Sequence, residues 1–130
     1  TSFGLGKSSM EEVVSVLPEG KTLGMSTVYK TYNPECIFTF NGKRTSLKKV
    51  HILDNQVSTY RGLKVGDSLK QVVKAYGPNY IYSGRKGQRQ DFEAIYSQDK
   101  KRSLIFSIRQ GKVRQIVLVE EMWPDKAARE

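Results

Sequence analysis

Two stretches of the chain place apolar residues at the spacing of a helix. Each has four of them at positions i, i+3, i+4 and i+7: Met10, Val13, Val14 and Leu17 in the first, and Leu69, Val72, Val73 and Tyr76 in the second. Ser9 and Ser68 precede them in a Ser-x-x-Glu/Gln motif, which is typical of a helix N-terminus. Pro18 and Gly77 follow as stop signals. The pattern predicts two short, capped helices, each of which buries one stripe of apolar side chains.

Segments of alternating apolar and polar residues follow each helix and predict strands. The expected strands lie at 27–32, 37–40 and 50–53, and again at 91–97, 105–108 and 116–119. Asn41-Gly42 and Gln110-Gly111 offer glycine where a hairpin turn needs a positive φ. The expected fold class is α+β: two tandem α-β-β-β repeats, residues 1–58 and 59–130, forming one continuous unit with both helices packed on one face of a curved antiparallel sheet.

Strand parity predicts which side chains share a face. Eight apolar residues are expected to face the helices: Phe38, Phe40, Val50, Ile52, Phe106, Ile108, Ile116 and Leu118. The opposite face is then too apolar for a surface in water, so either something covers it or it binds a partner. The positions expected to contact a protein partner are Tyr29, Thr39, His51, Ser107, Arg109 and Val117.

Charge adds an electrostatic component to this picture. The chain of 130 residues has a formal net charge of +9, and residues 61–130 carry +7 of it. Such a field favours an anionic partner. Arg85 and Arg89 lie in a polar segment that is expected to form a loop, where they would steer an acidic protein toward the binding face. The alternative is that the basic second repeat binds a nucleic acid or an anionic envelope polymer.

Candidate catalytic residues are few. Cys36 and His51 are the only residues of their kinds, and parity directs them to opposite faces of the sheet, which argues against a nucleophile and base pair. Gly6-Lys7-Ser8 matches only the end of a phosphate-binding loop, and no strand precedes it. We therefore expect a buried, inert thiol, a helix-entry turn, and no catalytic site, metal site or cofactor.

Further features bear on the class of protein. A composition of 38% hydrophobic residues supplies a core, and one cysteine excludes an internal disulfide. No run approaches the roughly 18 to 20 apolar residues that a membrane span needs, and no signal segment opens the chain, so we expect a soluble domain. The oligomeric state stays open.

Residues 63–77 carry a family resemblance. The order is a hydrophobic residue, a glycine, a capping serine, a short helix with two valines, and a Tyr-Gly stop. It resembles the opening of small extracytoplasmic bacterial modules, and is similar to the outer-membrane lipoprotein of the β-barrel assembly machinery and to tandem-repeat β-lactamase inhibitory proteins. The resemblance implies a secreted, periplasmic or cell-surface protein, free or lipid-anchored, whose curved sheet binds another protein without catalysis. The first repeat departs from the pattern, with one more residue between Gly6 and Ser9, and no inhibitory residue carries over.

Overall fold

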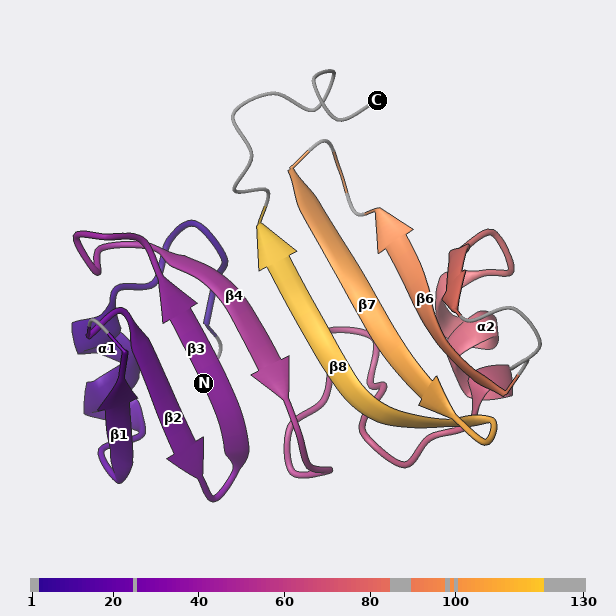
Figure 1. Ribbon diagram of the computed structural model, residues 1–130, viewed down its shortest axis with the longest axis horizontal. Helices are drawn as coiled ribbons and strands as arrows, with labels where there is room; N and C mark the ends of the chain where they lie inside the picture. Colours follow the sequence, from indigo (N-terminus) through magenta and orange to yellow (C-terminus); the bar gives the residue numbers. More distant parts are fainter. Residues whose placement is uncertain (1–2, 25, 85–89, 98, 100, 121–130) are drawn as a thin grey trace.

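One antiparallel sheet makes up most of the fold in a computed structural model, which describes residues 3–24, 26–84, 90–97, 99 and 101–120. Its eight strands lie in the order β1-β2-β3-β4-β8-β7-β6-β5. Figure 1 shows α1 near β1–β3 and α2 near β6, toward opposite ends of the sheet. The strands are β1 (Gly20–Leu23), β2 (Val28–Tyr32), β3 (Glu35–Phe40), β4 (Leu47–Ile52), β5 (Ile81–Gly84), β6 (Asp91–Ser97), β7 (Arg102–Arg109) and β8 (Lys112–Glu120), and the helices are α1 (Met10–Val16) and α2 (Leu69–Tyr76).

The predicted fold class, α+β built from two α-β-β-β repeats, is wrong. The fold is mostly β, because one eight-stranded sheet is accompanied by helices of only seven and eight residues. The prediction lacked the edge strands β1 and β5, each four residues long and exposed at every position. Strand prediction depends on alternating buried and exposed positions, and neither strand has that alternation. Each helix is followed by four strands, not three.

The two halves of the chain meet at the pairing of β4 with β8. We call α1 with β1–β4 the first half and α2 with β5–β8 the second half. His51 pairs with Val117 at the centre of this seam. The segments 50–53 and 116–119 correspond in the sequence pattern, so each half contributes the equivalent strand to the seam. One sheet spans both halves, while a domain division at residue 58 stays a prediction.

Both helices have the predicted capping box. The Ser9 hydroxyl accepts a hydrogen bond from the Glu12 backbone N–H at 3.2 Å, and the Glu12 carboxylate accepts one from the Ser9 N–H at 3.2 Å. Ser68 and Gln71 repeat this exchange at 3.1 and 2.8 Å. Each cap satisfies N–H groups that a helix N-terminus leaves without an internal partner. The described helices are too short to cross a lipid bilayer.

The core lies on one face of the sheet, which we call the core face. Most of the residues predicted to face the helices are buried there: Phe38, Phe40, Ile52, Phe106, Ile108 and Ile116. Val13 of α1 is buried in the first-half cluster and Val72 of α2 in the second-half cluster. Val50 and Leu118 are half-buried, and the two pair with each other at the seam.

The hairpin turns differ between the halves. Gln110 and Gly111 have positive φ values of 53° and 77°, which confirms the tight turn between β7 and β8. The predicted turn at Asn41-Gly42 is wrong, because Arg44 has the positive φ, at 61°. The Asn41 side-chain oxygen instead accepts hydrogen bonds from the backbone N–H groups of Thr45 and Ser46, at 2.9 and 3.0 Å, which closes a wider loop.

Candidate functional site: the outer face of the sheet

One row of side chains crosses the face opposite the core, which we call the outer face. The strand register aligns one residue from each strand, from β1 to β5: Lys21, Lys30, Ile37, His51, Val117, Ile105, Ile95 and Ile81. We call this line the outer row. Its first-half end has two lysines, and its second-half end has four consecutive β-branched apolar residues. Exposed sheet faces of antiparallel proteins usually present polar side chains, so this run is unusual.

Exposure rises toward the second-half edge of the outer row. Val117 is 8% exposed and therefore buried, Ile105 and Ile95 are half-buried, and Ile81 is 61% exposed. At the other end, the Lys30 ammonium lies 5.4 Å from the centre of the Tyr32 ring and 3.9 Å from the Glu35 carboxylate. The row thus offers apolar contact at one end and positive charge at the other.

Polar side chains form a chain beside the centre of the outer row. The Nδ1 atom of His51 lies 3.2 Å from the Gln115 side-chain oxygen, and the Gln115 amide donates to the Ser107 hydroxyl at 3.4 Å. Because the Gln115 oxygen only accepts, Nδ1 carries the proton and Nε2 is left as an acceptor. Burial lowers the pKa of His51 below 6.5, Lys49 lowers it further, and the hydrogen bond with Gln115 opposes both. The ring is therefore neutral at pH 7.

Arg109 is held by groups of the protein itself. Its guanidinium donates to the Glu93 carboxylate at 3.1 Å and to the Ile108 carbonyl oxygen at 2.8 Å. The second carboxylate oxygen of Glu93 is buried and accepts no hydrogen bond within the described residues. Arg109 thus serves first to neutralise Glu93 at the margin of the outer face.

The structure brings most of the predicted partner residues to one face. Thr39, His51, Ser107, Arg109 and Val117 share the parity of the outer row, although Ser107 and Val117 are buried. Arg85 and Arg89 lie outside the described residues. Ile95 and Ile81 are outward residues that were not predicted. Ile95 alternates with the buried residues Phe92, Ala94 and Tyr96, and that pattern could have revealed it.

The prediction that Tyr29 faces outward is wrong. Tyr29 is 3% exposed and pairs with Phe38, so both side chains lie on the core face. Its hydroxyl donates to the Leu17 carbonyl oxygen at 2.5 Å. The neighbouring residues Val28 and Lys30 are the outward positions of β2, and the pattern of this strand alone did not reveal its phase.

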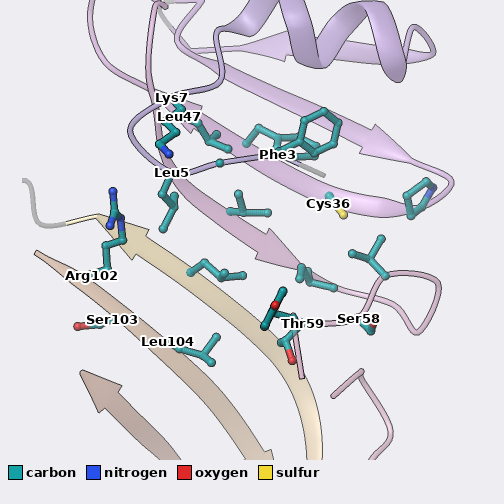
Figure 2. Close-up of a pocket in the computed structure, with 18 of the residues that line it drawn as sticks. Phe3, Leu5, Lys7, Cys36, Leu47, Ser58, Thr59, Arg102, Ser103 and Leu104 are labelled. Atoms are coloured by element: carbon teal, nitrogen blue, oxygen red, sulfur yellow. The ribbon is translucent and has the colours of Figure 1, made fainter. Parts of the chain in front are cut away.

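The core face has an open groove of about 810 Å³ between the two halves. Figure 2 shows Phe3 and Cys36 on one side of it and Leu104 on the other, with Thr59 below Cys36 in the view. Tyr60, also a lining residue, is fully exposed. No sequence pattern predicts this groove, because its walls come from segments far apart in the chain.

Arg102, which lines the groove, belongs to a cluster of charged side chains. The Lys48 ammonium lies 2.5 Å from the Glu120 carboxylate, and the Arg102 guanidinium lies 3.9 Å from it. Gly6, with φ +76°, packs against the same carboxylate, and a Cβ at this position would collide with it. The Gly6 N–H donates to the Leu47 carbonyl oxygen, and the Ser8 hydroxyl accepts from the Gly4 N–H. Gly6-Lys7-Ser8 thus forms a structural turn before α1. The Gly6 N–H and the Ser8 hydroxyl already have hydrogen-bond partners within the fold.

Cys36 and His51 lie on opposite faces, as parity predicted. Cys36 is 2% exposed on the core face, and burial with the nearby Asp54 charge raises the pKa of its thiol to about 11. Such a thiol is a poor nucleophile at neutral pH. Within the described ranges, no three His, Cys, Asp or Glu side chains lie close enough together to hold a metal ion.

The fold is similar to that of one solved protein. No protein-family model matches the sequence, and a comparison with curated proteins finds no match. The crystal structure of YjgB, a DUF4309 family protein from Bacillus subtilis subsp. subtilis str. 168, superposes with a TM-score of 0.65. The two sequences are 16% identical, and the match covers 93% of this chain and 84% of the other. At this identity the similarity concerns the fold alone.

Proposed function

We propose that this protein is a non-catalytic binding module that recognises another protein through the outer face of its sheet. The observation that carries the proposal is the outer row, in which Val117, Ile105, Ile95 and Ile81 form one apolar line across four adjacent strands. Water solvates such a line poorly, and a partner that covered it would gain apolar burial.

The dimensions of the outer face suit a protein partner. Eight strands spaced about 4.8 Å apart span about 34 Å across the sheet. A standard protein interface buries about 800 Å² on each side, which a face of this width can supply. A small ligand would instead favour a concave, enclosed site.

Charge indicates what kind of protein would bind. The chain carries +9, and Lys21 and Lys30 stand at the first-half end of the outer row. An acidic partner, or a protein of the cell envelope, would be attracted by this field, and Arg85 and Arg89 would add to the attraction. The family resemblance supports an extracytoplasmic location for this encounter, on the cell surface, in the periplasm or outside the cell.

The test compares the two faces of the sheet. Immobilised protein is exposed to envelope extract and washed in rising salt, using the wild type, Ile105→Asp on the outer face and Tyr60→Asp beside the groove. We expect the wild type and Tyr60→Asp to retain one and the same protein at about 1 M salt, where screening leaves mainly apolar contacts. Ile105→Asp should lose it.

Two results would contradict the proposal. If all three forms retain the same protein equally, the outer face is not the contact surface. If only nucleic acid or anionic polymer is retained and is released at moderate salt, the basic charge is the binding determinant and the alternative function takes precedence.

A further inference from the structure

The groove on the core face lies over the seam between the two halves. One row of core-facing residues crosses the sheet there, and the strand register aligns Tyr29, Phe38, Val50, Leu118, Leu104 and Tyr96. The four residues away from the seam are buried, whereas Val50 and Leu118, which pair at the seam, are only half-buried. This row is therefore least covered where the halves meet, and both seam residues line the groove.

The walls of the groove suit an apolar ligand. The buried residues of the core form two clusters, and the half-buried residues Val50 and Val57 pack against both. Most of the residues that line the groove are apolar, and its volume of about 810 Å³ lies in the range of about 300–1,000 Å³ that small-molecule sites have. Water solvates apolar walls poorly, so a ligand that displaced it would gain apolar burial.

The length of the groove suits an extended acyl chain. β4 lines it from Leu47 to Ile52, and the steps between these residues, at about 3.4 Å each, give up to about 17 Å. Carbon–carbon bonds of about 1.5 Å in a zigzag advance about 1.25 Å each, so a chain of up to about 14 carbons has this length. A single acyl chain can therefore lie along the groove over Val50 and Leu118.

Lys7 stands at the Leu47 end of the groove. The Gly6 N–H donates to the Leu47 carbonyl oxygen at 2.7 Å, which holds the turn that carries Lys7 against the start of β4. Lys7 is one of the residues that line the groove. Among the residues that the structure describes, no acidic side chain forms an ion pair with its ammonium.

Arg102 lies at the same end, and its charge is balanced. Its partner on β8 is Glu120, whose carboxylate forms an ion pair with Lys48, the second residue of β4. The Arg102 guanidinium lies 3.2 Å from the Asp99 carboxylate and 3.9 Å from that of Glu120. Figure 2 shows Lys7 and Arg102 on the same side of the view. Lys7 thus supplies the positive charge that the described acidic groups at this end leave without a partner.

We propose that the groove binds a long-chain fatty acid, with its acyl chain over Val50 and Leu118 and its carboxylate toward Lys7. The apolar walls and the length specify the acyl chain, and one ammonium matches the single negative charge of a carboxylate. The ligand binds without covalent chemistry. The site lies on the core face, so it goes beyond the proposed function, which depends on the outer face.

Calorimetric titration of the full chain tests the kind of ligand. Saturated fatty acids from octanoate to hexadecanoate are added at concentrations below micelle formation. The affinity should rise by up to about fourfold for each added methylene and level off near tetradecanoate, where the acyl chain fills the groove. Dodecylamine, which has the opposite charge, should bind about tenfold more weakly than dodecanoate.

Two matched pairs of variants test the place of binding. Leu118→Trp fills the floor of the groove, and Val119→Trp puts the same side chain on the outer face. We expect Leu118→Trp to weaken dodecanoate binding at least about tenfold and Val119→Trp to leave it unchanged. Lys7→Gln should weaken it about fivefold at low salt, and Lys70→Gln, an exposed position on α2, should not. Circular dichroism checks that each variant is folded.

Methyl NMR of the wild type locates the ligand without any substitution. The resonances of Val50 and Leu118 should shift when dodecanoate is added, and those of Ile105 and Val117 on the outer face should not. Shifts confined to the outer face would overturn the proposal.

Three other results would also overturn it. They are the absence of binding at any chain length, dodecylamine that binds as tightly as dodecanoate, and folded Leu118→Trp that binds as tightly as the wild type. A dimer in solution that Leu118→Trp dissociates would show that a second copy fills the groove, which contradicts the proposal as well. Ile105→Asp should bind dodecanoate like the wild type, so loss of a protein partner by that variant concerns the outer face alone.

Discussion

The two halves of the molecule begin alike and end differently. Each starts with a serine-capped helix, and each contributes one strand to the seam. In the second half, β7 and β8 have eight and nine residues, whereas β3 and β4 have six each. The Phe106 ring centre lies 5.6 Å from that of Tyr76 and 5.9 Å from that of Tyr96, while Phe38 contacts Phe3 and lines the open groove.

This difference shows that the local sequence pattern forms the helices but does not determine how tightly each core is packed. The same capping motif and the same apolar spacing form both helices, but the residues that surround each core decide how well it is enclosed. The second half combines an aromatic core with the apolar end of the outer row. The first half has the cationic end of that row and much of one wall of the groove. Three matched pairs of substitutions and one single substitution test this comparison.

The largest expected effect is in the two cores. Phe106→Ala should reduce the free energy of unfolding by about 3–5 kcal/mol, because Phe106 is fully buried between two aromatic rings. Phe38→Ala should cost about 1 kcal/mol less, since its neighbours can relax into the groove that it already borders. Urea denaturation followed by circular dichroism measures both. Equal losses would mean that the groove does not weaken the packing of the first half.

The next largest effect concerns two glycines with nearly the same positive φ. Gly6 and Gly111 have φ values of 76° and 77°, so alanine at either position should cost about 1–2 kcal/mol from the left-handed backbone. Gly6→Ala should cost about 1 kcal/mol more, because its Cβ displaces the Glu120 carboxylate from Lys48. Thermal unfolding compares them. In a Glu120→Ala background the difference should vanish, and its persistence would refute this explanation.

The helix caps should contribute equally. Ser9→Ala and Ser68→Ala each remove a hydroxyl that accepts an N–H bond at the helix start, and each should cost about 1 kcal/mol. Ser15→Ala is the control, because Ser15 is exposed and donates only to a carbonyl within α1. Urea denaturation of the three variants gives the comparison. A cap that costs no more than the control would show that its helix is held by packing alone.

The smallest effect is a pH dependence at the seam. The pKa of His51 in the folded protein is below its ordinary value of 6.5, mainly because the ring is partly buried. Protonation therefore favours the unfolded chain, and the free energy of unfolding should decrease as the pH falls below about 6.5. His51→Val places at this position the residue found at the equivalent position of the second half, Val117. The substitution should remove the contribution of His51 to the loss of stability at low pH. A variant with an unchanged pH profile would contradict the assignment to His51.

The sequence predicts local features well where a side chain settles the conformation. The Ser9 and Ser68 caps, the Gln110-Gly111 turn and the opposite faces of Cys36 and His51 are all confirmed. Each depends on neighbouring residues, such as a hydroxyl near free N–H groups or a glycine in a tight turn. Such features can be derived without knowing how the strands pair.

Other features depend on contacts between distant parts of the chain. Tyr29 faces the core because β2 pairs with β3 in one register, which the alternation within β2 does not specify. β1 and β5 are strands because a neighbour pairs with them, although neither buries a side chain. The wrong fold class follows from these two strands. The outer row could be assembled only once all seven strand pairings were known.

Photo-cross-linking from the two faces tests the central claim most directly. A benzophenone amino acid replaces Thr39, a half-buried residue that flanks the outer row, or the exposed Tyr60 beside the groove. Neither position contributes to the apolar line of the outer row. The account predicts that one specific protein from envelope extract is cross-linked at position 39 and not at position 60. Cross-linking of that protein at position 60 alone would contradict the claim that the outer face of the sheet is the binding surface.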